Sequence, residues 1–154
     1  MEIGLPTPLG PICLTERDGV IVGLRWRAAD PGGDSLGGES PALREAAAQL
    51  RAYFDGRLTR FDLALDWGAG LQAQVRRAMA AIPFGQTRTY GDLAREIGVP
   101  AQAIGQACGA NPVPILIPCH RILGANSLGG FSAKGGVETK VWLLRHEGAA
   151  GLLI

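Results

Sequence analysis

Hydrophobic positions near the N-terminus follow the two-residue period of extended chain. Pro11–Glu16 and Val20–Trp26 are β-rich runs, and Asp18-Gly19 stands between them as a turn signal. This order predicts a β-hairpin.

A helical period begins after residue 39. Ser40 is a residue type that caps helices, and Pro41 suits the first helical position. The apolar spacing continues to about Phe54, and Gly56 predicts the helix end. The face expected to be buried consists of Leu43, Ala47, Leu50 and Phe54.

Two further segments complete the predicted N-terminal half. Asp30–Gly38 is rich in Gly, Asp and Ser and predicts a loop. Phe61–Leu65 alternates apolar and polar residues and predicts a strand. Residues 1–69 are therefore expected to form a small α/β domain that supports the rest of the chain.

The second half begins with helical patterns. An apolar stripe predicts a helix over Leu71–Ile82, which Pro83-Phe84-Gly85 ends. Tyr90–Ile97 and Ala101–Ala110 predict two short helices, and Gly98-Val99-Pro100 joins them by a tight turn. This arrangement predicts a helix-turn-helix.

Three further segments follow the predicted helix-turn-helix. Val113–Ile117 is a short buried run, Leu128–Gly136 is a Gly-rich loop, and Val137–Glu147 predicts a closing helix. The predicted fold class is α+β, with a mainly helical second domain over residues 70–154.

The second helix of the helix-turn-helix has almost no side-chain bulk. Tight packing against another helix explains such a helix, and so does insertion into the narrow minor groove of DNA. The sequence leaves both explanations open. The small residues are Ala101, Ala103, Gly105, Ala107 and Gly109.

Charge divides unevenly along the chain. Residues 1–70 carry a formal charge of −3 and residues 71–154 carry +4. A basic half suits an anionic partner such as nucleic acid, although charge alone favours an ordinary solvated surface. Met1–Gly10 lacks the basic start of a signal peptide, and no apolar run could cross a bilayer, so we expect a cytoplasmic protein without membrane contact.

Cysteine and histidine are sparse. The three cysteines, Cys13, Cys108 and Cys119, show no CxxC spacing, so we expect neither a disulfide framework nor a metal site, and no cofactor. Cys119 is followed directly by His120. A nearby base can turn a thiol into a nucleophilic thiolate, and a carboxylate such as Glu147 can orient that base.

One stretch of the chain closely resembles the active-site signature of the O6-alkylguanine-DNA alkyltransferases, the methylated-DNA–protein-cysteine methyltransferases. This stretch is Asn111-Pro-Val-Pro-Ile-Leu-Ile-Pro-Cys-His-Arg121. The resemblance extends over about residues 71–148. Its other motifs are Ile82-Pro83-Phe84-Gly85, Thr89-Tyr90-Gly91, Leu128-Gly129-Gly130-Phe131 and Leu143-Leu144-Arg145-His146-Glu147-Gly148.

The resemblance implies a suicidal DNA repair reaction in which Cys119 keeps an alkyl group taken from O6 of guanine. It implies that His120 draws off the thiol proton through a bridging water and that Glu147 orients His120. Asn111 would tie the helix-turn-helix to the active-site segment. Tyr90 would donate a hydrogen bond to N3 of the flipped guanine.

The resemblance also implies a substrate pocket and a DNA surface. The main chain at Cys119 and Ile122 would accept from the guanine 2-amino group, and backbone N–H groups of the loop would face O6. A monomer would bind alkylated double-stranded DNA through its minor groove and flip the base. The loop residues are Phe131, Ser132, Ala133 and Lys134, and the expected DNA contacts are Tyr90, Ala101, Gln102, Ala103, Gly105 and Arg121.

Gln102 departs from the family pattern. The family usually has an arginine here that fills the gap left by the flipped base, and glutamine brings neither a charge nor a planar guanidinium. The loop from Phe131 to Gly136 also looks longer than the common form.

Three alternatives stay open at this stage. An alkyltransferase-like damage-binding protein would bind DNA without efficient transfer, but such proteins lack the acceptor cysteine. A helix-turn-helix regulator should carry long polar side chains on its second helix, where this chain offers only Gln102 and Gln106. An alkyltransferase for small molecules has no direct support in the sequence.

Overall fold

A computed structural model describes residues 1–27, 40–131 and 135–149 of the chain. Within it the chain divides into two units, Met1–Asp66 and Trp67–Ile154. The first unit carries an antiparallel sheet and the second is mainly helical, which confirms the predicted α+β class. The expected loop at Asp30–Gly38 lies outside the described residues. No described helix is long and apolar enough to span a membrane.

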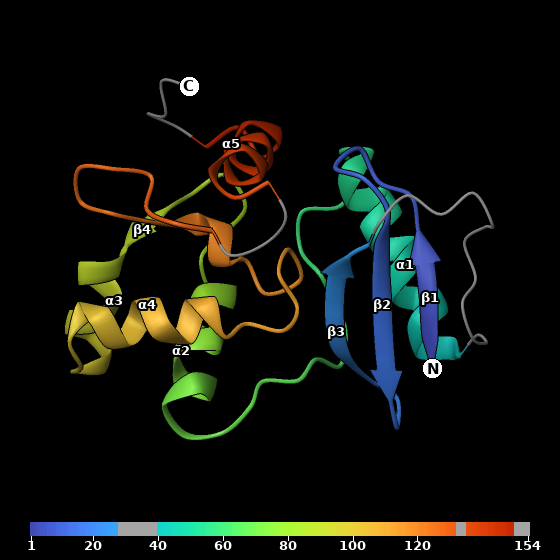
Figure 1. Ribbon diagram of the computed structural model, residues 1–154, viewed down its shortest axis with the longest axis horizontal. Coiled ribbons are helices and arrows are strands. Elements are labelled where there is room, and N and C mark those ends of the chain that lie inside the picture. Colours follow the sequence, from blue (N-terminus) through green and yellow to red (C-terminus); the bar gives the residue numbers. More distant parts are fainter. Residues whose placement is uncertain (28–39, 132–134, 150–154) are drawn as a thin grey trace. The chain divides into compact units, whose positions relative to one another are not determined.

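The first unit is a three-stranded sheet with one helix packed on it (Figure 1). The strands β1 (Glu2–Leu5), β2 (Ile12–Arg17) and β3 (Val20–Trp26) pair antiparallel in that order. The predicted hairpin is confirmed as β2–β3, whereas the sequence patterns did not predict β1. Helix α1 (Pro41–Phe54) contacts all three strands.

Helix α1 begins as its sequence predicts. The Ser40 backbone is extended, and its hydroxyl accepts a hydrogen bond from the Leu43 amide at 3.1 Å. This bond satisfies one of the amides that have no partner within the helix. The buried face includes Tyr53, whereas Phe54, which was expected there, stays partly exposed.

The strand predicted over Phe61–Leu65 is wrong. In this segment only Leu65 forms a bridge, which pairs it with Ile21 of β3. The Gln49 side chain takes the place of a neighbouring strand: it accepts from the Asp62 amide at 2.9 Å and donates to the Asp62 carbonyl at 3.0 Å. The alternating burial is real, but the Gln49 side chain satisfies the backbone of Asp62 in place of a ladder, and only the end of the segment bonds to the backbone of Ile21.

The second unit contains the predicted helix-turn-helix. Helices α3 and α4 pack on each other, and Gly98 joins them with a φ of 85°, which a residue with a side chain rarely adopts. The elements of this unit are α2 (Gly70–Ala80), β4 (Arg88–Thr89), α3 (Tyr90–Ile97), α4 (Ala101–Gly109), η1 (Cys119–Arg121), β5 (Ile122–Leu123) and α5 (Val137–His146).

A short parallel pairing, which the sequence patterns did not predict, connects distant parts of this unit. Arg88 pairs with Ile122 and Thr89 pairs with Leu123. The start of α3 is thereby held beside the strand that follows the η1 turn of Cys119–Arg121. Tyr90, the first residue of α3, is placed by this pairing.

We expect loss of the α3 cap to destabilise the second unit. The Thr89 hydroxyl accepts from the Asp92 amide at 3.0 Å, and the Asp92 carboxylate accepts from the Thr89 amide at 2.9 Å. Thr89→Ala removes half of this capping box and should lower the free energy of unfolding by about 1 kcal/mol in urea titrations. Thr89→Ser keeps the hydroxyl and should lose much less; equal losses would show that the cap contributes nothing.

Candidate active site

Cys119 lies at the wall of a pocket in the second unit. It begins the 3₁₀ turn η1, where its amide donates to the Ile117 carbonyl at 2.8 Å, and its side chain is buried apart from 7% of its surface. The pocket has a volume of about 400 Å³, within the range of small-molecule sites. Its lining residues are Tyr90, Gly105, Cys108, Gly109, Cys119, Gly130 and Phe131.

The segment before Cys119 is held in a strained conformation. Ile115 has a φ of 75°, which is unfavourable for a β-branched residue by about 1–3 kcal/mol. The Ile117 amide donates to the Val113 carbonyl at 2.9 Å and closes a tight turn around Ile115. Strain of this kind persists only where surrounding contacts fix the backbone.

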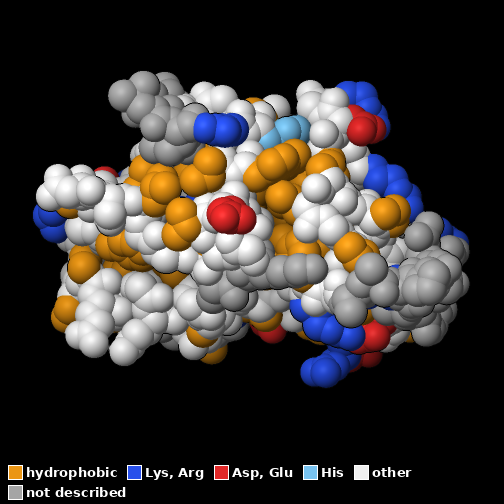
Figure 2. Space-filling view, turned by 45° about the horizontal axis from the view of Figure 1, so that its top comes forward, with side chains coloured by type: hydrophobic (Ala, Val, Ile, Leu, Met, Phe, Trp, Pro, Cys, Tyr) orange, Lys and Arg blue, Asp and Glu red, His pale blue; other side chains and the backbone are white. Residues whose placement is uncertain are grey.

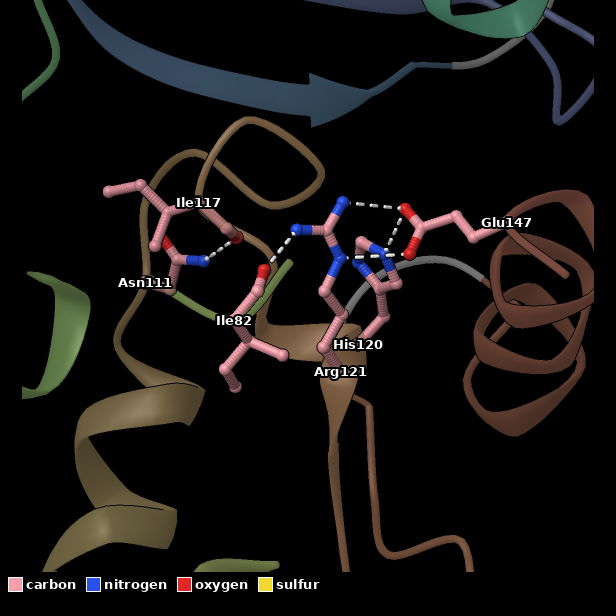
Figure 3. Close-up of polar contacts among 6 residues, drawn as sticks. All are labelled: Ile82, Asn111, Ile117, His120, Arg121 and Glu147. Carbon is pink, nitrogen blue, oxygen red and sulfur yellow. Dashed lines mark hydrogen bonds and ion pairs between the residues drawn. The ribbon is translucent and has the colours of Figure 1, made fainter. Parts of the chain in front are cut away.

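Asn111 supplies two of those contacts. Its side-chain amide donates to the Ile117 carbonyl at 2.9 Å (Figure 3). Its side-chain oxygen accepts from the Val113 amide at 3.1 Å. Asn111 follows Ala110, the C-cap of α4, so one side chain joins the end of the helix-turn-helix to the segment that carries Cys119.

A buried carboxylate joins α5 to the η1 turn. Glu147 contacts His120 Nε2 through Oε2 at 2.8 Å and Arg121 Nε through Oε1 at 2.8 Å (Figure 3). A second Arg121 nitrogen, Nη2, donates to Oε2 at 3.0 Å, so the pairing is bidentate. The remaining terminal nitrogen of Arg121 donates to the Ile82 carbonyl at 2.6 Å.

These contacts fix the charge states of the network. Burial alone would raise the pKa of Glu147, but hydrogen bonds from His120 and Arg121 outweigh it and lower the pKa to about 2. Burial lowers the pKa of His120, against the opposing effect of Glu147. At neutral pH, Glu147 is therefore ionised and His120 is neutral.

The network leaves one nitrogen of His120 able to accept a proton. Because ionised Glu147 only accepts hydrogen bonds, Nε2 of the neutral ring must carry the hydrogen. Nδ1 is then bare, and it is buried without a hydrogen-bond partner among the described residues. Burial raises the pKa of the Cys119 thiol, and the Asn111 side chain lowers it. A thiol in this position needs such a base to become a thiolate.

Tyr90 keeps its place in the pocket wall because Gly129, which lies against its ring, has no side chain. Gly129 has a φ of 72°, and a Cβ on it would lie 2.9 Å from the Tyr90 ring. Any other residue at position 129 would push Tyr90 aside. The sequence identified the motif that contains Gly129 and did not identify this close approach.

Packing within the described residues does not explain the glycines on the face of α4. A Cβ added to Gly105 or Gly109 would meet no atom within 4 Å. Ala101 and Gln102 are exposed at the start of the helix, and Ala103 is partly exposed. Tight helix–helix packing therefore does not explain these glycines.

Arg121 does not lie where the sequence analysis placed it. It was expected to contact DNA, but it is 6% exposed, and Glu147 and the Ile82 carbonyl occupy its guanidinium. The sequence suggested that this arginine, next to the candidate nucleophile, would contact DNA at the surface. The sequence does not reveal that its partner is Glu147. The expected loop residues Ser132, Ala133 and Lys134 lie outside the described residues, whereas Phe131 lines the pocket.

Two further residues of this region were not predicted. Cys108 lines the pocket with Cys119, and burial raises its pKa to about 12. Lys140 is fully buried, and its ammonium donates to the carbonyls of Ile122 at 2.6 Å and Gly130 at 3.1 Å. Its position in the apolar stripe of a predicted helix was the available signal. Over the described part of the chain, no three His, Cys, Asp or Glu side chains group as metal ligands.

Surface charge does not by itself identify a binding face. Among the described side chains that Figure 2 shows, Lys and Arg lie in separate groups and not in one continuous patch. The α4 face and the pocket are therefore better guides to a partner than the net charge of the second unit.

Comparisons with known proteins cover nearly the whole chain. Residues 70–149 match the family described as 6-O-methylguanine DNA methyltransferase, DNA binding domain. Residues 4–67 match the family described as 6-O-methylguanine DNA methyltransferase, ribonuclease-like domain. The methylated-DNA–protein-cysteine methyltransferase of Mycolicibacterium paratuberculosis is 42% identical over 147 residues, which are 92% of this chain and 88% of that protein. Its namesake from Mycobacterium tuberculosis is 40% identical over 149 residues, 93% of this chain and 89% of that protein.

Solved structures agree with these sequence matches. The crystal structure of Mycobacterium tuberculosis OGT in complex with DNA has a TM-score of 0.81 at 38% identity, covering 96% of this chain and 92% of that one. The structure of the O6-methylguanine methyltransferase from the same organism has a TM-score of 0.78 at 37% identity, covering 100% and 97%.

Acid should destabilise the fold through His120 and Glu147. Both have a folded-state pKa below the ordinary value, so stability is present at neutral pH. It should fall as pH drops below about 6.5, where unfolded histidine binds a proton, and by about 3 kcal/mol more between pH 4.5 and 2, where unfolded glutamate does. The measurement is the free energy of unfolding against pH. Glu147→Gln should remove the lower step, and Glu138→Gln, on the exposed side of the same helix, should retain it; a retained step in Glu147→Gln would contradict the assignment.

Proposed function

The chain belongs to the 6-O-methylguanine DNA methyltransferase family, and we propose that Cys119 is the cysteine that accepts the alkyl group. The protein repairs DNA by direct transfer of an alkyl group from O6 of guanine to one of its own cysteines. The observation that carries the assignment is that the pocket-lining thiol of Cys119 is followed directly in the chain by a buried His120 whose Nδ1 is bare. Cys13 lies buried in the sheet of the first unit, and burial raises the pKa of the Cys108 thiol to about 12. Burial raises the pKa of the Cys119 thiol too, so it is the adjacent base His120 that favours Cys119 as the acceptor.

The reaction begins with removal of the thiol proton. His120 Nδ1 accepts it through a bridging water, and ionised Glu147 stabilises the imidazolium that forms. Arg121 holds Glu147 in place, and its positive charge keeps the Glu147 carboxylate ionised. Arg121 is thus a positioning residue for the His120–Glu147 pair.

Transfer then exchanges one bond for another. The Cys119 sulfur attacks the alkyl carbon, the S–C bond forms, and the C–O6 bond breaks with its electron pair left on guanine. The Tyr90 hydroxyl donates a hydrogen bond to N3 and stabilises this anion. Burial raises the pKa of Tyr90, which keeps its proton available as a donor. The product is a thioether that water does not hydrolyse, so each molecule acts once.

Recognition of the flipped base falls to the pocket walls. The main-chain carbonyls at Cys119 and Ile122 accept from the guanine 2-amino group. The loop that begins at Phe131 supplies N–H groups toward O6 in this proposal; its residues Ser132, Ala133 and Lys134 lie outside the described residues. Phe131 lines the pocket, which supports this assignment for the described part of the loop.

The duplex contacts α4 through its minor groove. The exposed positions of Ala101 and Gln102 and the open space at Gly105 support this placement. A helix without bulk can approach the walls of a narrow groove, and minor-groove binding is tolerant of sequence. We further propose that the protein acts as a cytoplasmic monomer, with residues 70–154 carrying the chemistry and residues 1–69 supporting them.

A damage-binding protein without transfer is not favoured. Such a protein lacks the acceptor, whereas here Cys119 is present beside the His120–Glu147 pair. The curated relatives over nine-tenths of the chain carry the name of the transferase.

Transfer should be stoichiometric and confined to Cys119. After incubation with DNA that contains O6-methylguanine, intact-mass analysis should find one added methyl group, and peptide mapping should place it on Cys119. Cys119→Ser should take up none, and Cys108→Ser is the matched control that should still react. Methyl groups on Cys13 or Cys108, or several turnovers per molecule, would contradict the proposal.

Gln102 should limit repair of duplex DNA. Arginine would stack in the space left by the flipped base and offset part of the few kcal/mol that unstacking costs, which glutamine does less well. Gln102→Arg should therefore speed transfer from duplex, about tenfold for each 1.4 kcal/mol gained, and leave transfer from free O6-benzylguanine unchanged. Gln106→Arg, four residues further along α4, is the control for added charge. Unchanged or slower duplex repair in Gln102→Arg would mean that another residue fills the gap.

A further inference from the structure

A second thiol lies in the pocket that Cys119 lines. Cys108, on α4, is part of the same wall around about 400 Å³, and both cysteines are free thiols. Each side chain is buried except for a small part that faces the pocket, 8% of Cys108 and 7% of Cys119. The proposed transfer uses Cys119 alone and gives Cys108 no role.

Asn111 holds the two cysteines close together. Its backbone amide donates to the Cys108 carbonyl at 3.2 Å. Its side-chain amide donates to the Ile117 carbonyl at 2.9 Å, and the same carbonyl accepts from the Cys119 amide at 2.8 Å. One residue thus connects the backbones of both cysteines through hydrogen bonds. A disulfide requires such proximity, because its two Cα atoms lie roughly 4.4–6.8 Å apart.

The surroundings of the two thiols determine which of them an oxidant attacks. The Cys108 sulfur lies 3.5 Å from the Met79 sulfur on α2, a neighbour that cannot accept a proton at neutral pH. Burial and, to a smaller extent, the nearby Cys119 raise the pKa of Cys108 to about 12. Burial raises the pKa of Cys119 too, but His120 follows it directly and can take its proton. Since peroxides react with thiolates, Cys119 is the thiol that is oxidised first.

We propose that Cys108 is the resolving cysteine of a reversible disulfide with Cys119, which forms when a peroxide oxidises the alkyl acceptor. The Cys119 sulfur attacks one peroxide oxygen, the S–O bond forms, the O–O bond breaks, and the released hydroxide takes up the thiol proton as water. The Cys108 sulfur then attacks the sulfur of this sulfenic acid. The S–S bond forms, and the hydroxyl group leaves with the Cys108 proton as a second water. The two thiols lose two electrons in total, and these electrons reduce the peroxide.

Such a bond preserves an acceptor that each molecule uses once. A sulfenic acid without a resolving thiol is oxidised further to sulfinic and sulfonic acids, which thiols do not reduce. The disulfide stops oxidation at the first stage, and a dithiol returns both cysteines to the reduced state. Transfer is blocked while the bond persists, because the Cys119 sulfur is occupied. This loss of transfer rests on the proposed function, whereas formation of the bond does not.

The first test is a tryptic peptide map of the protein after brief treatment with hydrogen peroxide. The chain has no Lys or Arg between Glu96 and Arg121, so both cysteines lie in one peptide, which contains no methionine. Without reduction, this peptide should be lighter by two hydrogen atoms and should not react with iodoacetamide after denaturation. Transfer from O6-benzylguanine should be lost in parallel, and dithiothreitol should restore both the thiols and the transfer.

Two variants show whether Cys108 is the resolving thiol. Peroxide should add two or three oxygen atoms to Cys119 in Cys108→Ser, and dithiothreitol should not restore its transfer. Cys13→Ser removes a buried cysteine of the first unit and should form the same cross-linked peptide as the unaltered protein. The proposal is overturned if Cys108→Ser recovers as completely as the unaltered protein. Added oxygen on Cys119 beside a free Cys108 in the unaltered protein overturns it too.

A second test needs no substitution and covers the case in which Cys108→Ser does not fold. Protein that has first reacted with O6-benzylguanine should carry the benzyl group on Cys119, and peroxide should then leave Cys108 able to react with iodoacetamide after denaturation. Loss of the Cys108 thiol from this benzylated protein would show that it is oxidised without Cys119, which contradicts the proposal. Absence of the benzyl group from Cys119 would instead refute the acceptor assignment, and the cross-link in the Glu96–Arg121 peptide is measured separately.

Discussion

The buried carboxylate of Glu147 is the constraint on which the active site depends. It receives three hydrogen bonds from two side chains of the η1 turn, and Arg121 extends the connection to the Ile82 carbonyl. One charge thus ties α5, η1 and the end of α2 together. The same carboxylate determines which nitrogen of His120 carries hydrogen, so the stability and the chemistry of the site share one interaction.

The region around Cys119 combines rigidity with charge control. Asn111 and the tight turn at Ile115 fix the backbone that precedes the thiol, and the β4–β5 pairing fixes the backbone that follows it. Lys140 connects Ile122 with the loop at Gly130. Such preorganisation suits the proposed transfer to Cys119, because it holds the sulfur in line with the alkyl carbon and lowers the barrier to attack.

Much of the fold could be predicted because its signals are local. The β2–β3 hairpin, the Ser40 cap and the helix-turn-helix each depend on a few neighbouring residues whose conformational preferences agree. The Phe61–Leu65 segment shows the limit of this reasoning. Its pattern is that of a strand, yet Gln49 on α1, thirteen residues before Asp62, satisfies the backbone of Asp62.

The sequence by itself determined the α+β class, the helix-turn-helix, and the motifs around Cys119, His120 and Glu147. Each of these depends on short runs of residues that are neighbours along the chain. Only the tertiary structure decided that Arg121 binds Glu147, that Gly129 lets Tyr90 approach, and that Lys140 is buried behind the pocket. The sequence gives the type of a charged residue, but it does not show whether the side chain faces water or a buried partner. Its partner lies far along the chain, and burial, which sets the pKa and the strength of each charge, exists only once the chain has folded.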